Sequence, residues 1–100
     1  MELTGRVVVV TGAARGIGRA LATRFVKEGP RALVVVDIDE AGVRRVARDI
    51  GASAFRCDVA NDSDVERLLG EVETHHGPID IFCSNAGIAV GGGPETPDED

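Results

Sequence analysis

The 100-residue sequence contains no tyrosine, no tryptophan and a single lysine. Without a phenol, no side chain of this chain can donate or accept a proton as a catalytic tyrosine does. Apolar runs are short, and none approaches the roughly 20 residues that a membrane-spanning helix needs. We therefore expect no membrane partner and no chemistry that depends on an aromatic hydroxyl.

Cysteine is also scarce, with Cys57 and Cys83 in apolar, strand-like runs and no CxxC pair. A small secreted domain of this length would usually carry several paired cysteines. The first residues show no basic segment followed by an apolar one, so no secretory signal is predicted. These features predict a cytoplasmic protein with Cys83 as a packed core thiol.

Basic residues are outnumbered, because eleven Lys and Arg face seventeen Asp and Glu and give a net charge of −6. Binding to nucleic acid needs clustered basic residues that displace counterions, so no nucleic-acid partner is expected. Hydrophobic residues make up 43% of the chain and charged residues 28%, an ordinary globular mixture. The length predicts one small domain, or part of a larger one.

Short apolar runs alternate with segments of helical periodicity along the chain. Strands are predicted at 6–11, 32–36, 53–56 and 79–83, and helices at 17–28, 39–50 and 63–76. This βαβαβαβ alternation predicts an α/β fold, a doubly wound parallel sheet with strand order 3-2-1-4 and helices on both faces.

Several details of this fold are also predicted. Ser63 and Glu66 have the spacing of a capping box at the start of the third helix. Residues 1–90 are expected to form the folded segment, and residues 91–100 a mobile loop with an acidic tail. The fourth strand is then expected to be an open, apolar edge of the sheet, which predicts marginal stability.

A glycine-rich turn lies between the first strand and the first helix. Gly12, Gly16 and Gly18 follow the spacing G-x-x-x-G-x-G. Glycines let a pyrophosphate approach backbone N–H groups closely, and the positive end of the helix attracts that anion. The pattern therefore predicts a phosphate-binding turn, and the alternative is a tight turn that only packs the helix on the strand.

Asp37 follows the second strand, 19 residues after Gly18. A carboxylate at that point can accept hydrogen bonds from both ribose hydroxyls of an adenosine, and it repels a 2′-phosphate. This favours NAD over NADP, whereas Arg15 favours NADP because a guanidinium can pair with the phosphate. The alternative for Asp37 is a cap on the next helix, which Asp39 could provide equally well.

Four motifs in this order resemble the classical short-chain dehydrogenase/reductases over about residues 3–90. They are T-G-x-x-x-G-I-G at 11–18, the acid after the second strand, Asp58-Val59 after the third and Asn85-Ala86-Gly87 after the fourth. The resemblance implies a Rossmann-type fold that binds a nicotinamide dinucleotide. Repulsion by Asp37 outweighs the attraction of an exposed Arg15, so NAD is predicted and NADP is less favoured. The residues implied to contact the cofactor are Gly12, Arg15, Gly16, Ile17, Gly18, Asp37, Asp58, Val59, Asn85, Ala86 and Gly87.

The roles that the resemblance implies differ along the cofactor. The glycine turn would line the pyrophosphate and the adenosine ribose, and Asp37 would bind that ribose. Asp58 would hydrogen-bond the adenine amino group beside the Val59 backbone. The Asn85-Ala86-Gly87 segment would lie near the nicotinamide ribose. Ser84 stands where the family often has asparagine, which alters the local hydrogen-bond network.

The family's reaction uses a serine, a Tyr-x-x-x-Lys pair and an asparagine that normally follow such a segment, so no catalytic residue is predicted in this chain. The resemblance implies an oxidoreductase that acts on a small alcohol or carbonyl substrate and forms homo-oligomers. It also implies a chain truncated before its catalytic half, or one whose missing half is supplied by another chain. The alternative is a non-catalytic dinucleotide-binding or interaction module. His75-His76 are expected at a solvated helix end, and no metal site is predicted.

Overall fold

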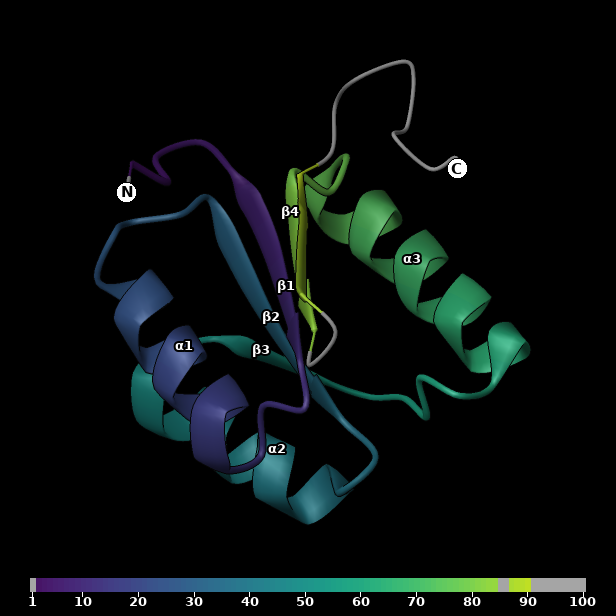
Figure 1. The fold of residues 1–100 in the computed structure, drawn as a ribbon. Coiled ribbons are helices and arrows are strands. Elements are labelled where there is room, and N and C mark those ends of the chain that lie inside the picture. The colour runs from purple at the N-terminus through teal and green to yellow at the C-terminus, as the bar shows by residue number, and fades with distance from the viewer. Residues whose placement is uncertain (1, 85–86, 91–100) are drawn as a thin grey trace.

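The computed structural model describes residues 2–84 and 87–90 (Figure 1). The predicted alternation of strands and helices is confirmed, and the observed ends differ from the predicted ones by a few residues. The elements are β1 (Val7–Thr11), α1 (Gly16–Val26), β2 (Ala32–Asp37), α2 (Glu40–Ile50), β3 (Ser53–Arg56), α3 (Asp62–His76), β4 (Ile81–Ser84) and β5 (Gly87–Val90). None of the helices in these two ranges is long and apolar enough to span a bilayer.

The strands form one sheet in the order β3-β2-β1-β4-β5. β1 pairs in parallel with both β2 and β4, and β2 pairs in parallel with β3. Val9 of β1, for example, lies between Val34 and Phe82. The predicted α/β class and the strand order 3-2-1-4 are therefore confirmed.

The fifth strand corrects one prediction, because β4 is not an open edge. β5 runs antiparallel to β4, with Ile81 opposite Val90 and Ser84 opposite Gly87. Only two residues separate β4 from β5, and antiparallel strands can be joined by so short a connection whereas parallel strands cannot. Pairing satisfies the N–H and C=O groups that an unpaired apolar edge would leave exposed. The predicted loop at 91–100 lies outside the described residues.

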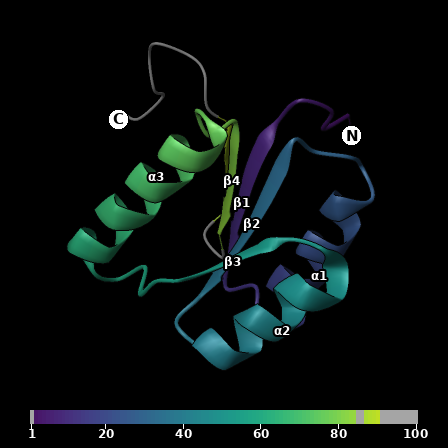
Figure 2. The ribbon, with the colours of Figure 1, turned by 180° about the vertical axis from the view of Figure 1, so that it is seen from behind.

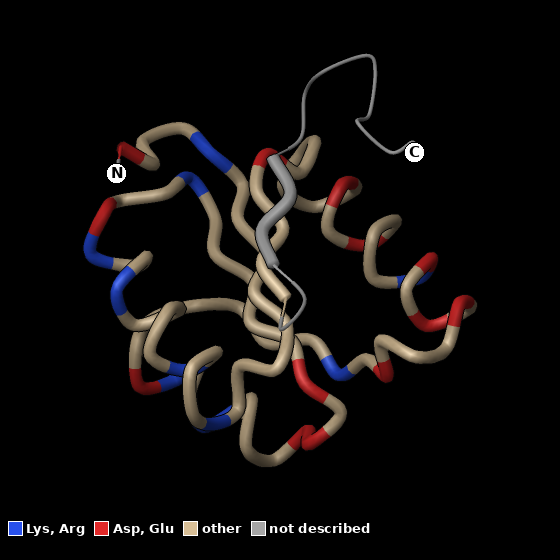
Figure 3. Tube along the Cα trace, viewed as in Figure 1, with Lys and Arg blue, Asp and Glu red and all other residues tan. Residues whose placement is uncertain are grey.

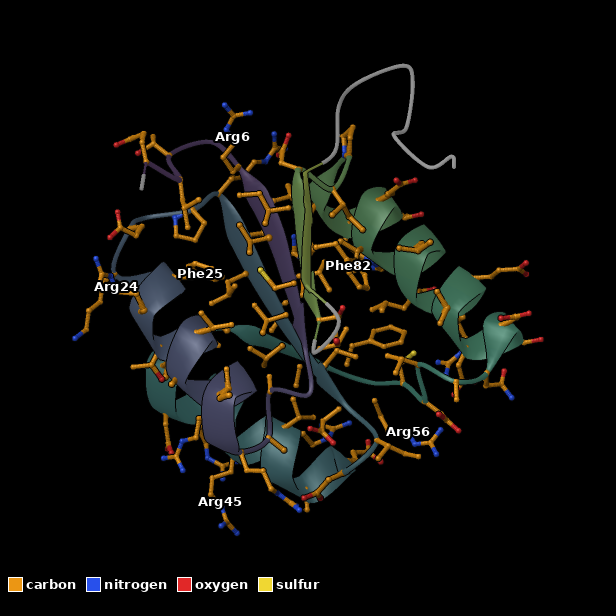
Figure 4. All side chains as sticks on the ribbon, in the orientation of Figure 1. Arg6, Arg24, Phe25, Arg45, Arg56 and Phe82 are labelled. Atoms are coloured by element: carbon orange, nitrogen blue, oxygen red, sulfur yellow. The ribbon has the colours of Figure 1, made fainter. Side chains whose placement is uncertain are left out.

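Two hydrophobic layers hold the sheet, one on each face. α1 and α2 cover one face and α3 covers the other (Figures 1 and 2). Successive valines of β1 alternate between the layers, so that Val8 and Val10 pack with α1 and α2, and Val7 and Val9 pack with α3. Phe25 of α1 and Phe82 of β4 lie on opposite faces (Figure 4). Burying each valine side chain stabilises the fold by about 1.5 kcal/mol or more, which explains the long valine runs.

The helices differ at their N-terminal ends. Asp39 caps α2 by accepting a hydrogen bond from the Gly42 N–H at 3.0 Å. Asn61 caps α3 by accepting one from the Asp64 N–H at 2.9 Å. The predicted capping box of Ser63 and Glu66 is therefore wrong, because the helix already begins at Asp62 and Ser63 lies inside its first turn. α1 alone of the three has no side-chain cap.

Candidate dinucleotide site

A cleft of about 450 Å³ lies where β1, β2 and β3 end. The strands are parallel, so the turns that follow them meet at one edge of the sheet, where doubly wound folds bind ligands. The residues that line the cleft are Gly12, Arg15, Ile17, Gly18, Asp37, Ile38, Cys57, Asp58 and Val59. Seven of these were predicted from the sequence, and Gly16 lies in the same turn.

The glycine turn forms the part of the cleft next to α1. Gly12 and Gly16 have φ angles of +66° and +64°, a conformation that side chains with a Cβ rarely adopt. A Cβ at Gly18 would overlap the carbonyl oxygen of Gly12 and lie 2.7 Å from its carbonyl carbon. α1 therefore approaches the turn as closely as its backbone permits.

The N-terminus of α1 is suited to an anion. It has neither a side-chain cap nor an acidic residue in its first turn, whereas α2 and α3 have both. The first N–H groups of a helix lack partners within the helix, and the helix dipole makes this end positive. A phosphate group in the cleft would satisfy these donors and this charge.

Asp37 is held at the end of β2 by two backbone donors. One carboxylate oxygen accepts from the Ala14 N–H at 3.0 Å, and the other accepts from the Asp39 N–H at 3.0 Å. Each carboxylate oxygen can accept more than one hydrogen bond, so both retain capacity for a ligand hydroxyl. The helix-cap alternative for Asp37 does not hold, since Asp39 caps α2.

Arg15, which lines the cleft, forms an ion pair with Asp39. Its Nη2 lies 2.6 Å from Oδ2 of Asp39, and 77% of the Arg15 side chain is exposed. The Gly42 N–H, and then Arg15, lower the pKa of Asp39. The sequence suggested Arg15 for a phosphate, and the structure shows it bound to a carboxylate 24 residues along the chain.

Asp58 and Val59 occupy the turn after β3. Asp58 accepts a hydrogen bond from the Ala60 N–H at 3.0 Å, and its own N–H donates to Asp64 at 3.0 Å. That N–H is the main reason why the pKa of Asp64 is lowered, with Arg67 and Arg56 adding to it. Asp64 thus fixes the turn that presents Asp58 to the cleft.

Apolar side chains lie exposed around the cleft, with Ile17 at 78% and Ile38 and Val59 at 55% exposure. Sequence reasoning missed Ile38 and Cys57. The signal for Ile38 was an apolar residue between two aspartates in a turn, where there is no core for it to fill. Exposed apolar groups at a cleft offer a surface for a flat aromatic ring.

A smaller hollow of about 100 Å³ continues toward β4 and shares Ile17 and Gly18 with the cleft. Its other lining residues include Thr11 and Cys83, and the buried Thr11 hydroxyl donates to the Cys83 carbonyl at 3.4 Å. Of the predicted residues near it, Gly87 begins β5. Asn85 and Ala86 lie outside the described residues.

The histidines lie at the end of α3, and both cysteines are buried, Cys57 beside the cleft. His75 is in the last turn of α3, with Nδ1 2.8 Å from the Glu71 carbonyl oxygen. Among residues 2–84 and 87–90 no three His, Cys, Asp or Glu side chains gather as metal ligands. Cys57 and Cys83 are free and buried, and burial raises the pKa of both thiols. Cys83 is therefore a packed core thiol, as predicted.

Comparison with known proteins matches this chain to dehydrogenases. The family model described as short chain dehydrogenase matches residues 6–100. The L-fucose dehydrogenase of Oryctolagus cuniculus is 45% identical over 84 residues, which cover 83% of this chain and 29% of that protein.

Two solved structures from Brucella melitensis share the fold. One, named as ribose-5-phosphate isomerase, has a TM-score of 0.80 at 37% identity and covers 86% of this chain and 33% of that one. The other, a 3-ketoacyl-(acyl-carrier-protein) reductase complexed with NADH, has a TM-score of 0.76 at 38% identity and covers 81% and 34%. The chain thus spans about a third of the length of the proteins it matches.

Proposed function

This chain belongs to the short-chain dehydrogenase family, and from that premise we propose that residues 1–90 are the dinucleotide-binding segment of an oxidoreductase. The reaction would transfer a hydride between NAD and a small alcohol or carbonyl substrate. One observation carries the proposal: a single cleft joins the uncapped N-terminus of α1 to Asp37 and Asp58. That arrangement supplies donors for a pyrophosphate and acceptors for a ribose and an adenine.

Each part of the cleft suits one part of the cofactor. The N–H groups of the glycine turn would bind the pyrophosphate, and Asp37 would accept hydrogen bonds from the ribose hydroxyls. Ile38 and Val59 offer apolar contact to the adenine, and Asp58 offers a carboxylate to its amino group. The cleft volume of about 450 Å³ lies in the range of small-molecule sites.

The charges in the cleft favour NAD over NADP. Two backbone N–H groups hold the Asp37 carboxylate where a ribose would bind, so a 2′-phosphate would meet a fixed negative charge. Like charges held close together cost several kcal/mol at a desolvated contact. The related reductase complexed with NADH supports a nicotinamide cofactor.

When bound, the cofactor would supply the hydride, and this chain would bind and orient it. No tyrosine is present to transfer the substrate proton, so the residues of this chain act in positioning. We propose that the Asn85-Ala86-Gly87 segment contacts the nicotinamide ribose, as the family resemblance implies. We propose the cytoplasm as the location and a homo-oligomer as the assembled form.

The second candidate is a non-catalytic dinucleotide-binding or interaction module, since binding a dinucleotide requires only the residues of this cleft. The two candidates differ in one measurement on the whole protein, because no catalytic residue is predicted in this chain. An oxidoreductase reduces NAD in the presence of some member of a panel of small alcohols, followed by the absorbance of NADH. A module binds NADH and reduces NAD with none of them.

Calorimetric titration with NADH tests the proposal. The wild-type chain should bind NADH, and Asp37→Asn should weaken binding by about tenfold, since hydrogen bonds to a charged group contribute about 1.5 kcal/mol. Asp49→Asn, on the exposed surface of α2, is the matched control and should leave affinity unchanged. A chain that is folded by circular dichroism and does not bind NADH would refute the proposal.

A further inference from the structure

We propose that Asp39 is a second determinant of cofactor preference. Its carboxylate forms an ion pair with Arg15, the guanidinium that a 2′-phosphate would need. This inference rests on the proposed function and adds a residue to it. Arg15 is the one Lys or Arg among the described residues that line the cleft. With Arg15 bound to Asp39, the cleft opposes a 2′-phosphate in two ways: Asp37 repels it, and no free guanidinium attracts it.

The contact joins the N-terminal ends of two helices. Arg15 is the N-cap residue of α1 and Asp39 is the N-cap residue of α2. Asp39 uses Oδ2 for Arg15 at 2.6 Å and Oδ1 for the Gly42 N–H at 3.0 Å. The carboxylate therefore needs little reorganisation to hold the guanidinium.

Close packing keeps α2 against the glycine turn. A Cβ at Gly42 would lie 2.5 Å from Oδ2 of Asp39 and 3.1 Å from the Cβ of Ala14. Glycine at position 42 leaves room for the Asp39 carboxylate beside the first turn of α2 and for the close contact with Ala14. The position of Asp39 thus depends on helix packing and not only on two exposed side chains.

The ribose site and the ion pair are also joined. The Asp39 N–H donates to Oδ1 of Asp37, so the two carboxylates are held by consecutive hydrogen bonds on one short turn. Lys and Arg gather on α1 and α2, whereas α3 carries mainly Asp and Glu (Figure 3). Arg45 of α2 projects into solvent (Figure 4) and also lowers the pKa of Asp39. Arg15 and Arg45 therefore both act on Asp39, and of these two only Arg15 lines the cleft among the described residues.

Removal of the Asp39 charge should release Arg15 toward a 2′-phosphate. Asp39→Asn suits this test, because asparagine caps a helix about as well as aspartate and can still accept from the Gly42 N–H. We expect NADPH affinity to rise about three- to tenfold, the range for an exposed arginine that gains a charge-assisted bond. NADH affinity should change by less than about twofold, since NADH has no group for Arg15 to gain.

A double-mutant cycle assigns the gain to Arg15. In the Arg15→Gln, Asp39→Asn double variant, the increase in NADPH affinity should disappear. The matched control is Glu40→Gln, which removes the same charge one residue later and breaks an ion pair with Arg44, 2.9 Å long, away from the cleft. Glu40→Gln should leave the ratio of NADPH to NADH affinity unchanged.

The titrations separate the failure of this inference from that of the proposed function. Three results would each overturn the inference while NADH binding still supports the cleft. They are an unchanged ratio of NADPH to NADH affinity in Asp39→Asn, an increase in NADPH affinity that persists in the double variant, and an equal increase in Glu40→Gln. If wild-type chain bound neither nucleotide, both proposals would fail together. Asp39→Ser, which also retains a helix cap, replaces Asp39→Asn if thermal melting shows that variant to be unfolded.

Discussion

Gly18 is the position where a single methyl group should disturb both the fold and the cleft. Its Cα faces the carbonyl group of Gly12, and the added Cβ of Gly18→Ala would lie 2.7 Å from the Gly12 carbonyl carbon. The clash is with backbone, so no side chain can rotate to relieve it. α1 must move away from the turn after β1.

The size of the effect follows from two opposing terms. Overpacking of a close contact costs about 1–3 kcal/mol, and a backbone clash lies at the upper end of that range. Alanine in place of glycine in a helix recovers about 0.5–1 kcal/mol. We expect a net loss of about 2 kcal/mol in the free energy of unfolding, or a fall in Tm of about 8–16 °C for a domain of this size.

Gly70→Ala is the matched control, because a Cβ at Gly70 in α3 would meet no atom within 4 Å. This variant should gain about 0.5–1 kcal/mol, so the two substitutions should shift the urea midpoint in opposite directions. Gly18→Ala should also weaken NADH binding, since it moves the helix end that faces the phosphates, while Gly70→Ala should not. Equal stability and equal NADH affinity in wild type and Gly18→Ala would refute the close-approach argument.

Two further predictions concern α3. Asn61→Ala removes the cap and should cost about 1 kcal/mol in urea unfolding, whereas Ser63→Ala should cost less than about 0.5 kcal/mol; equal losses would contradict the cap assignment. Asp64→Asn tests a pH dependence. In the folded state the Asp58 N–H lowers the pKa of Asp64 below its ordinary 3.8. The ionised Asp64 therefore contributes its full share to the free energy of unfolding above pH 3.8, and this share is lost as the pH falls through the folded-state pKa. Wild type should exceed Asp64→Asn in stability at about pH 7, and the difference should shrink as the pH falls below the ordinary pKa of 3.8. A difference that widens at low pH would reverse the sign of the argument.

Most of the fold was predictable from the sequence because its signals are local and redundant. Valine runs bounded by turns predicted the buried strands, and helical periodicity predicted the helices between them. β5 was not predictable, because a four-residue segment takes its conformation from the strand that it pairs with. The cap of α3 was misassigned because Asn61 and Ser63 both suit an N-cap, and the backbone path decides between them.

The site residues that directly follow a strand could be predicted from the sequence. Gly18, Asp37 and Asp58 each follow a predicted parallel strand, and topology brings such turns to one edge. The pairing of Arg15 with Asp39 was not predictable, since it depends on the separation of two helix ends and on side-chain direction. Sequence spacing alone cannot show which of several nearby charges meet.

β1 is buried along its whole length and leads directly into the exposed glycine turn. All five of its residues are buried, with a strand on each side, whereas Arg15 and Ile17 a few positions later lie in solvent. The amide groups of the turn become exposed when a few contacts break. Those of β1 become exposed only when most of the domain unfolds. The amide protons of β1 should therefore exchange with solvent most slowly, and those of the turn quickly. A nucleotide bound in the cleft would therefore lie beside the rigid strand β1. Its binding would reduce the motion of the glycine turn and leave that of β1 unchanged.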